Sequence, residues 1–180
     1  MGGVEHLRNT FKSSFLLLLL LFGALLLAGC FGNEVNLQVG DKHISEEMNE
    51  VISDYIIQKY SSTYLDTEKQ FEVHKVYGTN ESDGVISVYM WSYYGGFNKS
   101  TGIENQAGHS LPAVIRLSKK EENYSVIEYT EPQDGSLYQS SLKKMFPKKY
   151  LKLAQQDSGN IEDLQKEMDW KVKQWLEKKE

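Results

Sequence analysis

An apolar segment near the start of the chain, Phe15 to Leu27, constrains most strongly what the remaining residues can fold into. Its 13 residues are too few for a membrane-spanning helix, which needs about 20. Arg8 and Lys12 precede it, and two small residues separate it from Cys30, the one cysteine of the chain. A basic segment, a short apolar segment and small residues before a cleavage point are the parts of a secretory signal peptide. We therefore expect the chain to be exported and its folded part to follow Cys30.

The end of this segment, Leu27-Ala28-Gly29-Cys30, resembles the lipobox of bacterial lipoproteins, and the resemblance covers residues 1–30. It implies cleavage between Gly29 and Cys30 and a diacylglyceryl group on the Cys30 thiol. Each buried methylene contributes about 0.8 kcal/mol, so two acyl chains hold a protein firmly to a bilayer. The resemblance also implies a place on the extracytoplasmic face of the cell membrane of a Gram-positive bacterium. The alternative is an uncleaved transmembrane anchor, which would also hold the domain outside the cytoplasm.

Removal of residues 1–29, the expected signal peptide, leaves 151 residues, a length that suits one domain. The whole chain has 20 basic and 25 acidic residues, and the removed segment carries two of the basic ones and one of the acidic ones. The mature chain then has 18 basic and 24 acidic residues, and its net charge of −6 argues against nucleic acid as a partner. With Cys30 acylated, no thiol remains for a disulfide, so stability must come from packing. We expect a lipidated tether over residues 30–42 and one domain over residues 43–180.

The pattern of apolar residues predicts one helix followed by four strands. The helix is expected from Ser45, a good N-cap, to about Tyr60, because its apolar residues recur at helical spacing. The strands are rich in Val, Ile, Tyr and Phe and are expected at Phe71–Tyr77, Val85–Tyr94, Ala113–Ser118 and Tyr124–Thr130. Short links within the first and the last pair favour antiparallel neighbours. Loops are expected at Gly78–Gly84 and, with four glycines, at Gly95–Leu111.

Two helices are expected after the sheet. The first runs from about Ser136 to Phe146 and stops before Pro147, and the second follows Asn160 as its N-cap. The whole pattern predicts an α+β fold, with an N-terminal helix packed on an antiparallel four-stranded sheet and with C-terminal helices. This order of elements is similar to that of the cystatin-like and NTF2-like folds, in which a curved sheet wraps a helix.

Two further segments resemble extracytoplasmic parts of other bacterial proteins. They are Glu128–Ser136 and Met145-Phe146-Pro147, which are similar to segments of small Gram-positive lipoproteins and to segments beside BlaR-type membrane sensor metallopeptidases. The His-Glu-x-x-His zinc motif of those peptidases is absent from this sequence, so the resemblance implies none of their activity.

The residue types that support catalysis or metal binding are scattered. His43, His74 and His109 lack the spacing typical of a metal site. No motif pairs the carboxylates that a hydrolase would need, which are Asp83, Glu104, Glu128, Glu131 and Asp134. We therefore expect no metal, no cofactor and no enzyme activity.

Tyr89, Trp91 and Tyr93 are alternate residues of one expected strand, so their side chains share one face of the sheet. One interpretation is that both faces of this strand are core. The other is a binding groove formed by these three aromatic residues and His109, with the Gly95–Leu111 loop as its lip. This groove is the candidate binding site that the sequence offers.

Five lysines form a basic cluster near the end of an acidic protein: Lys143, Lys144, Lys148, Lys149 and Lys152. The cluster is either a solvated helix face or a surface that contacts anionic lipid headgroups, where each lysine contributes about 1 kcal/mol.

These features favour a membrane-anchored, non-enzymatic binding or sensory module with an unidentified ligand. One alternative is an interaction or inhibitory lipoprotein that holds a membrane or cell-wall protein, and the other is a cell-wall hydrolase. A closed pocket beneath Trp91 would indicate a small ligand, and a flat exposed aromatic patch would indicate a protein partner.

Overall fold

The computed structural model describes residues 37–39, 44–64, 66–121 and 123–178. The signal segment, Gly29, Cys30 and His43 lie outside the described residues, as does most of the expected tether. Residues 36–180 form one unit by their internal contacts. Both hydrophobic cores of this unit are built from residues 44–176, so a chain of residues 31–180 contains everything that the cores need.

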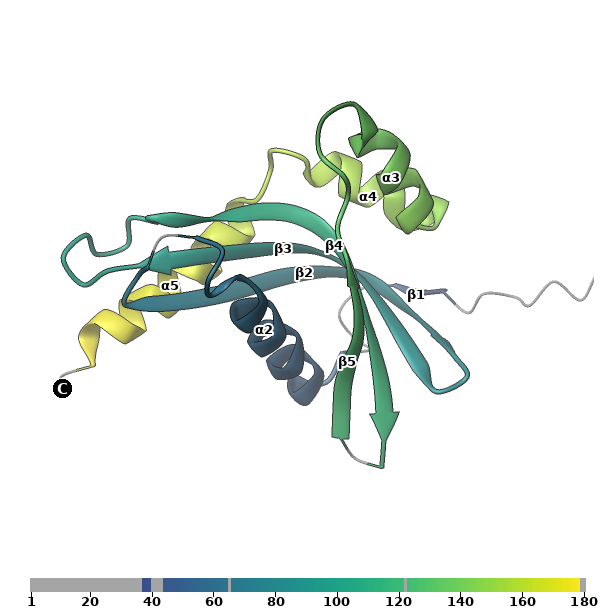
Figure 1. The fold of residues 1–180 in the computed structure, drawn as a ribbon, viewed down its shortest axis with the longest axis horizontal. Helices are drawn as coiled ribbons and strands as arrows, with labels where there is room; N and C mark the ends of the chain where they lie inside the picture. The colour runs from purple at the N-terminus through teal and green to yellow at the C-terminus, as the bar shows by residue number, and fades with distance from the viewer. Residues whose placement is uncertain (1–36, 40–43, 65, 122, 179–180) are drawn as a thin grey trace, which may run out of the picture. The chain divides into compact units, whose positions relative to one another are not determined.

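The described residues form one antiparallel sheet, with its strands in sequence order (Figure 1). The strands are β1 (Leu37–Val39), β2 (Lys69–Ser82), β3 (Val85–Phe97), β4 (Ala107–Lys120) and β5 (Asn123–Thr130). The predicted α+β class and the four predicted antiparallel strands are confirmed. The short strand β1 lies inside the expected tether, where it pairs with β2 from Gly78 to Asn80.

The strands are longer than predicted, and both predicted loops are largely wrong. Gly78 to Ser82 extends β2, so the link to β3 is the two-residue turn Asp83-Gly84, with φ values of 53° and 73°. Positive φ at both positions is typical of a tight type I′ hairpin turn. The second loop shrinks to residues 98–106, because Gly95 pairs with Gly108 in the ladder between β3 and β4. A Cβ on Gly108 would lie 2.1 Å from the Tyr94 carbonyl oxygen, so glycine here permits close strand pairing.

One face of the sheet is covered by α2 (Glu46–Tyr60), as predicted. The Ser45 hydroxyl caps this helix by accepting a hydrogen bond from the Met48 N–H at 3.2 Å, and acidic residues fill the first turn. Met48, Ile52 and Ile56 are fully buried against apolar residues of β2, β3 and β4. The helical spacing of these three residues therefore determines where the first core forms.

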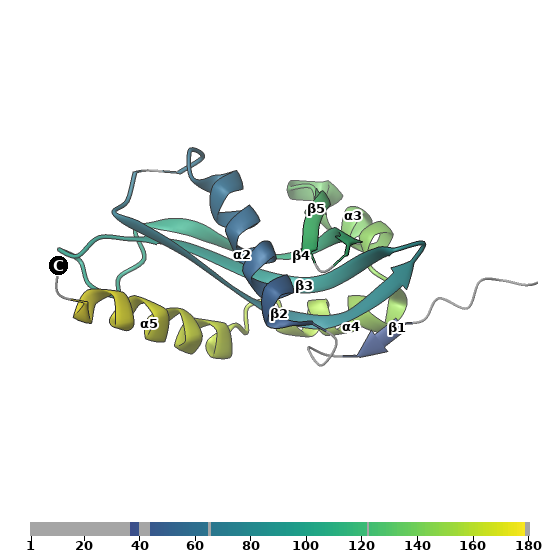
Figure 2. The same ribbon diagram turned by 90° about the horizontal axis from the view of Figure 1, so that it is seen from below.

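The opposite face is covered by three helices, α3 (Tyr138–Met145), α4 (Lys148–Asp157) and α5 (Glu162–Glu177). Figure 2 shows α2 and α5 on opposite sides of the sheet. The predicted helix at Ser136–Phe146 is a 3₁₀ turn, η2 (Gly135–Leu137), followed by α3. Helix α4 is not among the predicted helices, because it begins directly after Pro147 and has no capping side chain. Asn160 does not cap α5, whose N-cap is Ile161 without a side-chain hydrogen bond.

Candidate functional site

The four residues of the predicted groove are not brought together. Tyr89, Trp91 and Tyr93 are only 9%, 5% and 7% exposed and pack beneath α3, α4 and α5. His109 is the register partner of Tyr94, so it lies on the other face, where its ring stacks on that of Tyr94 at 5.5 Å. Helices cover both faces of β3, and the aromatic strand is therefore core on both sides.

A hollow of about 200 Å³ nevertheless borders Trp91. It lies where β2, β3, the link between α4 and α5, and the first turn of α5 meet. The lining residues are Lys75, Trp91, Asp157, Asn160, Ile161, Glu162, Asp163 and Leu164. Six of these residues come from the single stretch 157–164, while Lys75 and Trp91 come from the sheet, and of the eight only Trp91 is a predicted site residue.

The charges around this hollow are arranged unevenly. The Lys75 ammonium lies 2.8 Å from the Asp157 carboxylate, so the charges of these two residues cancel. Glu162 and Asp163 are exposed at the start of α5, so the lining has a net charge of −2. Burial and the neighbouring Asp157 raise the pKa of Tyr77 above its ordinary range, so this tyrosine stays protonated. A hollow with an indole wall, aliphatic side chains and excess negative charge suits a small organic cation.

The indole of Trp91 is held in a fixed orientation. Its Nε1–H donates a hydrogen bond to the Ser110 hydroxyl at 2.7 Å, and Ser110 is on the neighbouring strand β4. Trp91 is itself the register partner of Lys75 on β2. Strand pairing on both sides of β3 thus positions the wall of the hollow before any ligand binds.

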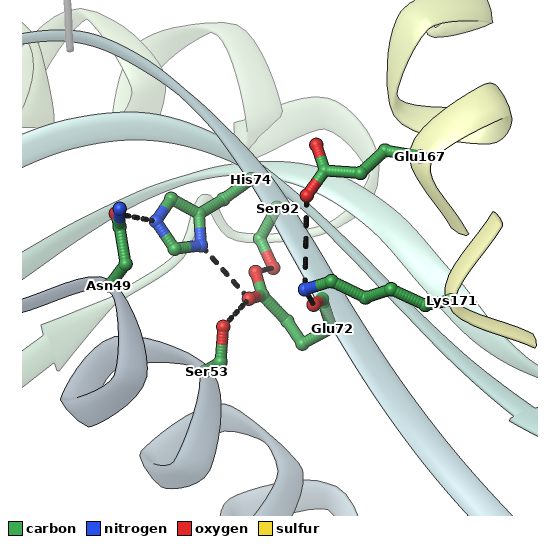
Figure 3. A network of polar contacts seen from close by, with 7 residues as sticks. All are labelled: Asn49, Ser53, Glu72, His74, Ser92, Glu167 and Lys171. Carbon is green, nitrogen blue, oxygen red and sulfur yellow. Dashed lines mark hydrogen bonds and ion pairs between the residues drawn. The ribbon is translucent and has the colours of Figure 1, made fainter. Parts of the chain in front are cut away.

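A second polar cluster, missed at the sequence level, is buried between α2 and the sheet (Figure 3). The Glu72 carboxylate is completely buried and accepts hydrogen bonds from the hydroxyls of Ser53 and Ser92, both at 2.7 Å. His74 Nδ1 lies 2.9 Å from the same carboxylate, and its Nε2 lies 3.1 Å from the Asn49 side-chain oxygen. With a proton on both ring nitrogens, His74 donates to both partners.

The charges of this pair stabilise each other. Burial alone would raise the pKa of Glu72, but the charge of His74 and its hydrogen bond, with those from the serines, hold this pKa below its ordinary value. Burial alone would lower the pKa of His74, but the Glu72 carboxylate raises it above its ordinary value. Because the pair is buried and hydrogen-bonded to α2 and β3, we interpret it as a structural link between the helix and the sheet. The sequence signal for this pair is a Glu and a His two residues apart in a strand, because alternate residues of a strand share one face.

From the other helix layer, Lys171 of α5 reaches the same part of β2. Its ammonium donates to the Glu72 carbonyl oxygen at 3.0 Å and lies 3.8 Å from the Glu167 carboxylate. Residues Lys69 to Tyr77 of β2 have no partner strand on their outer side in the described part of the chain. Lys171 therefore satisfies a backbone acceptor at a sheet edge that would otherwise be open.

His109 belongs to a tyrosine cluster at the C-terminal end of α2. Its Nδ1 lies 2.9 Å from the Tyr64 hydroxyl, and the Tyr60 hydroxyl donates a hydrogen bond to Glu131. Burial lowers the pKa of His109, so its ring is neutral at pH 7. His109 Nε2 is buried and has no hydrogen-bond partner among the described residues.

The carboxylates that a hydrolase would need do not converge in the structure. Asp83 and Glu104 lie at opposite ends of β3, Glu128 pairs with Arg116, and Glu131 binds Tyr60. No group of three or more His, Cys, Asp or Glu residues within the described ranges is arranged to hold a metal ion. All members of the basic cluster are exposed on α3 and α4, namely Lys143, Lys144, Lys148, Lys149 and Lys152.

Among the helices that the structure describes, none is both long and apolar enough to span a membrane. A scan against protein-family models, a search of curated proteins and a search of solved structures each found no match. The geometry defines a class of architecture, a five-stranded antiparallel meander with helices on both faces.

Proposed function

We propose that this protein is a lipid-anchored, extracytoplasmic binding module, and that its ligand is a small organic cation held in the hollow beside Trp91. The lipobox-like motif at Cys30 supports the anchor and the location, on the outer face of the cytoplasmic membrane of a Gram-positive bacterium. The hollow supports ligand binding and is the observation that carries the proposal. Its volume of about 200 Å³ lies below the roughly 300–1,000 Å³ of drug-sized sites, so the ligand is a small metabolite or the end of a peptide.

Three properties of the lining favour a cation with an apolar part. The Trp91 ring offers an aromatic wall beside Ile161 and Leu164. Glu162 forms no ion pair with any residue that the structure describes, and the exposed Asp163 is paired only with Lys166, 3.5 Å away at the surface. An ammonium or guanidinium group between the ring and these carboxylates would gain cation–π and ionic interactions together.

A thermal-shift screen of residues 31–180 tests this proposal. The panel contains lysine, arginine, putrescine, basic peptides and muropeptide fragments, with glutamate and glucose as anionic and neutral comparisons. A ligand at 100 times its Kd stabilises the native state by about 2.7 kcal/mol. For a domain of this size that corresponds to a rise in Tm of roughly 5–10 °C. A saturable shift for cations alone is the expected result.

Two double variants show whether the ligand occupies the hollow. Glu162→Gln with Asp163→Asn removes the charges at the start of α5 and is expected to weaken cation binding about tenfold, or roughly 1.4 kcal/mol. Glu46→Gln with Glu47→Gln is the matched control, because these are exposed acidic residues in the first turn of α2. Equal affinity in the two double variants would place the ligand elsewhere. A screen without any shift would refute the small-ligand proposal and favour a protein partner in the membrane or cell wall.

A further inference from the structure

The surface formed by α3 and by α4 up to Gln156 is basic, and the one acidic residue of these two helices, Asp157, is paired with Lys75 of β2. The segment from Gly135 to Gln156 contains five lysines and no aspartate or glutamate, in a mature chain of net charge −6. We call the five exposed side chains the basic face: Lys143, Lys144, Lys148, Lys149 and Lys152. In the part of the chain that the structure describes, no carboxylate forms an ion pair with any of them. The basic face is therefore available to an external anion.

Two of these lysines occupy unfavourable positions for an isolated protein. Lys148 and Lys149 are the first two residues of α4, and its first turn contains no acidic residue. The N-terminal end of a helix carries partial positive charge, so cations there destabilise the helix. An external anionic surface would offset this repulsion between the lysines and the helix dipole. A helix face that only contacts water gains nothing from lysines at these two positions.

The fold places α4, which carries three of the five lysines, next to the part of β2 that pairs with β1. Thr79 of β2 pairs with Gln38 of β1, and its carbonyl oxygen accepts a hydrogen bond from the Tyr150 hydroxyl of α4 at 3.4 Å. The residue next to Tyr150 in the sequence is Lys149. Figure 2 shows β1 and α4 at one end of the sheet, with the C-terminal end of α5 at the other.

Covalent geometry limits how far this end of the sheet can lie from the anchor. Eight residue steps separate Cys30 from Gln38, which span at most about 28 Å when fully extended. Strand β2 alone, with 14 residues, is about 46 Å long. If Cys30 is in the bilayer, Gln38 therefore lies within about 28 Å of it, whereas the other end of the sheet is under no such limit.

We infer that the basic face docks on the anionic lipid headgroups of the membrane in which Cys30 is anchored. This inference rests on the proposed lipid anchor for the location of the domain, whereas the charges that contact the headgroups are the lysines of α3 and α4. The headgroup phosphates supply the missing counter-charge, and the 52% exposed side chain of Leu137 adds an apolar contact from the same segment. Docking orients the domain, so that the far end of α5 points away from the bilayer.

Vesicle co-sedimentation of the unlipidated chain, residues 31–180, tests the basic face without the anchor. The vesicles are phosphatidylcholine alone or phosphatidylcholine with one quarter phosphatidylglycerol, in 0.1 M NaCl. We expect partitioning into the anionic vesicles only, and its loss in 0.5 M NaCl. Each lysine that reaches the surface contributes about fivefold in partitioning, so replacing all five by Gln should lower it by about 100-fold or more.

A charge-matched variant separates the position of the lysines from the net charge. It replaces five exposed lysines outside the basic face by Gln: Lys119, Lys120, Lys166, Lys173 and Lys178. This control should partition within about twofold to threefold of wild type. Equal loss in both variants, equal binding to neutral vesicles, or full competition by glycerol phosphate at the lipid phosphate concentration would overturn the inference. Circular dichroism of each variant checks that the fold is retained.

The anchor is tested separately with the full-length protein. Cys30→Ser is expected to abolish lipid labelling in cells and to leave the precursor uncleaved. If the Cys30→Ser protein is still acylated, the anchor proposal fails while the vesicle result keeps its meaning for the basic face. If the anchor is supported and the vesicles bind nothing, the docking inference alone fails.

Discussion

Replacing Glu72 by Gln should destabilise the fold strongly. It should also remove most of the pH dependence that the free energy of unfolding shows above pH 6.5. The carboxylate is fully buried and receives hydrogen bonds from Ser53, Ser92 and His74. A Gln side chain can accept from one serine with its oxygen, but its amide nitrogen must face the other serine or the imidazole. Removing one partner of a buried ion pair typically costs 3–5 kcal/mol. We expect the free energy of unfolding to fall by about 3 kcal/mol at pH 6, where a whole domain has roughly 5–15 kcal/mol.

The sign of the pH effect follows from the two pKa shifts. The pKa of His74 is raised, so its contribution is fully present below its ordinary value of about 6.5 and is lost as pH rises through the folded value. The pKa of Glu72 is lowered, so its contribution is present above about 4.5 and is lost as pH falls through the folded value. The pair therefore stabilises the protein most between about pH 4.5 and 6.5. Above that window, the free energy of unfolding falls by up to about 1.4 kcal/mol per pH unit until the folded pKa is passed.

Other charges near the pair leave this comparison intact. Lys171 lowers and Glu167 raises the pKa of His74, and both remain in the variant. The pKa of His109 is lowered by burial, so its contribution to the slope ends at about pH 6.5. The difference between wild type and Glu72→Gln above pH 6.5 therefore reports on His74.

Urea unfolding of residues 31–180, followed by circular dichroism at pH 6.0, 7.5 and 9.0, measures both effects. The matched control is Glu128→Gln, which breaks an exposed cross-strand pair with Arg116 on the same sheet. That change should cost only about 0.2–1 kcal/mol and should leave the slope between pH 6.5 and 9 unchanged. If Glu72→Gln costs no more than the control, or keeps the slope of wild type, the buried pair is not charged as we describe it.

Two further substitutions test the strand pairing and the helix cap. Gly108→Ala would place a Cβ 2.1 Å from the Tyr94 carbonyl oxygen. We therefore expect the free energy of unfolding, measured in urea, to fall by at least about 2 kcal/mol. A fall of less than about 0.5 kcal/mol would contradict the close pairing of β3 and β4. Ser45→Ala removes the acceptor for the Met48 N–H and should cost about 1 kcal/mol, while Ser45→Asp should restore the stability; equal stability of all three proteins would show that the cap contributes nothing.

The elements whose positions were predicted well are those with a strong local pattern. Helix α2 has a capping serine and a regular apolar stripe, and the central parts of β2 to β5 are runs of branched and aromatic residues. The ends of β3 and β4 were mistaken for a loop because Gly95 and Gly108 are weak strand formers. Their place in the sheet depends on how closely the two backbones approach, which is a property of the pairing.

The candidate site was predicted only in part, because its residues converge from distant parts of the chain. Trp91 was singled out for its aromatic strand, but Lys75, Asp157 and Glu162 reach the same hollow only after the sheet has formed and α4 and α5 have packed on it. The basic cluster was visible as a composition, while its place beside β1 depends on the contact of Tyr150 with Thr79.

The sequence by itself determined the fold class, the periodic elements and the motif at Cys30, since helical and strand spacing and short motifs are local properties of the chain. The tertiary structure decided that both faces of β3 are covered, that Glu72 and His74 form a buried pair facing α2, and that His109 lies on the opposite face from Trp91. These outcomes depend on strand register and on which helix covers which face. Both are set by packing between segments up to about 100 residues apart, as between Lys171 and Glu72, which no local pattern encodes.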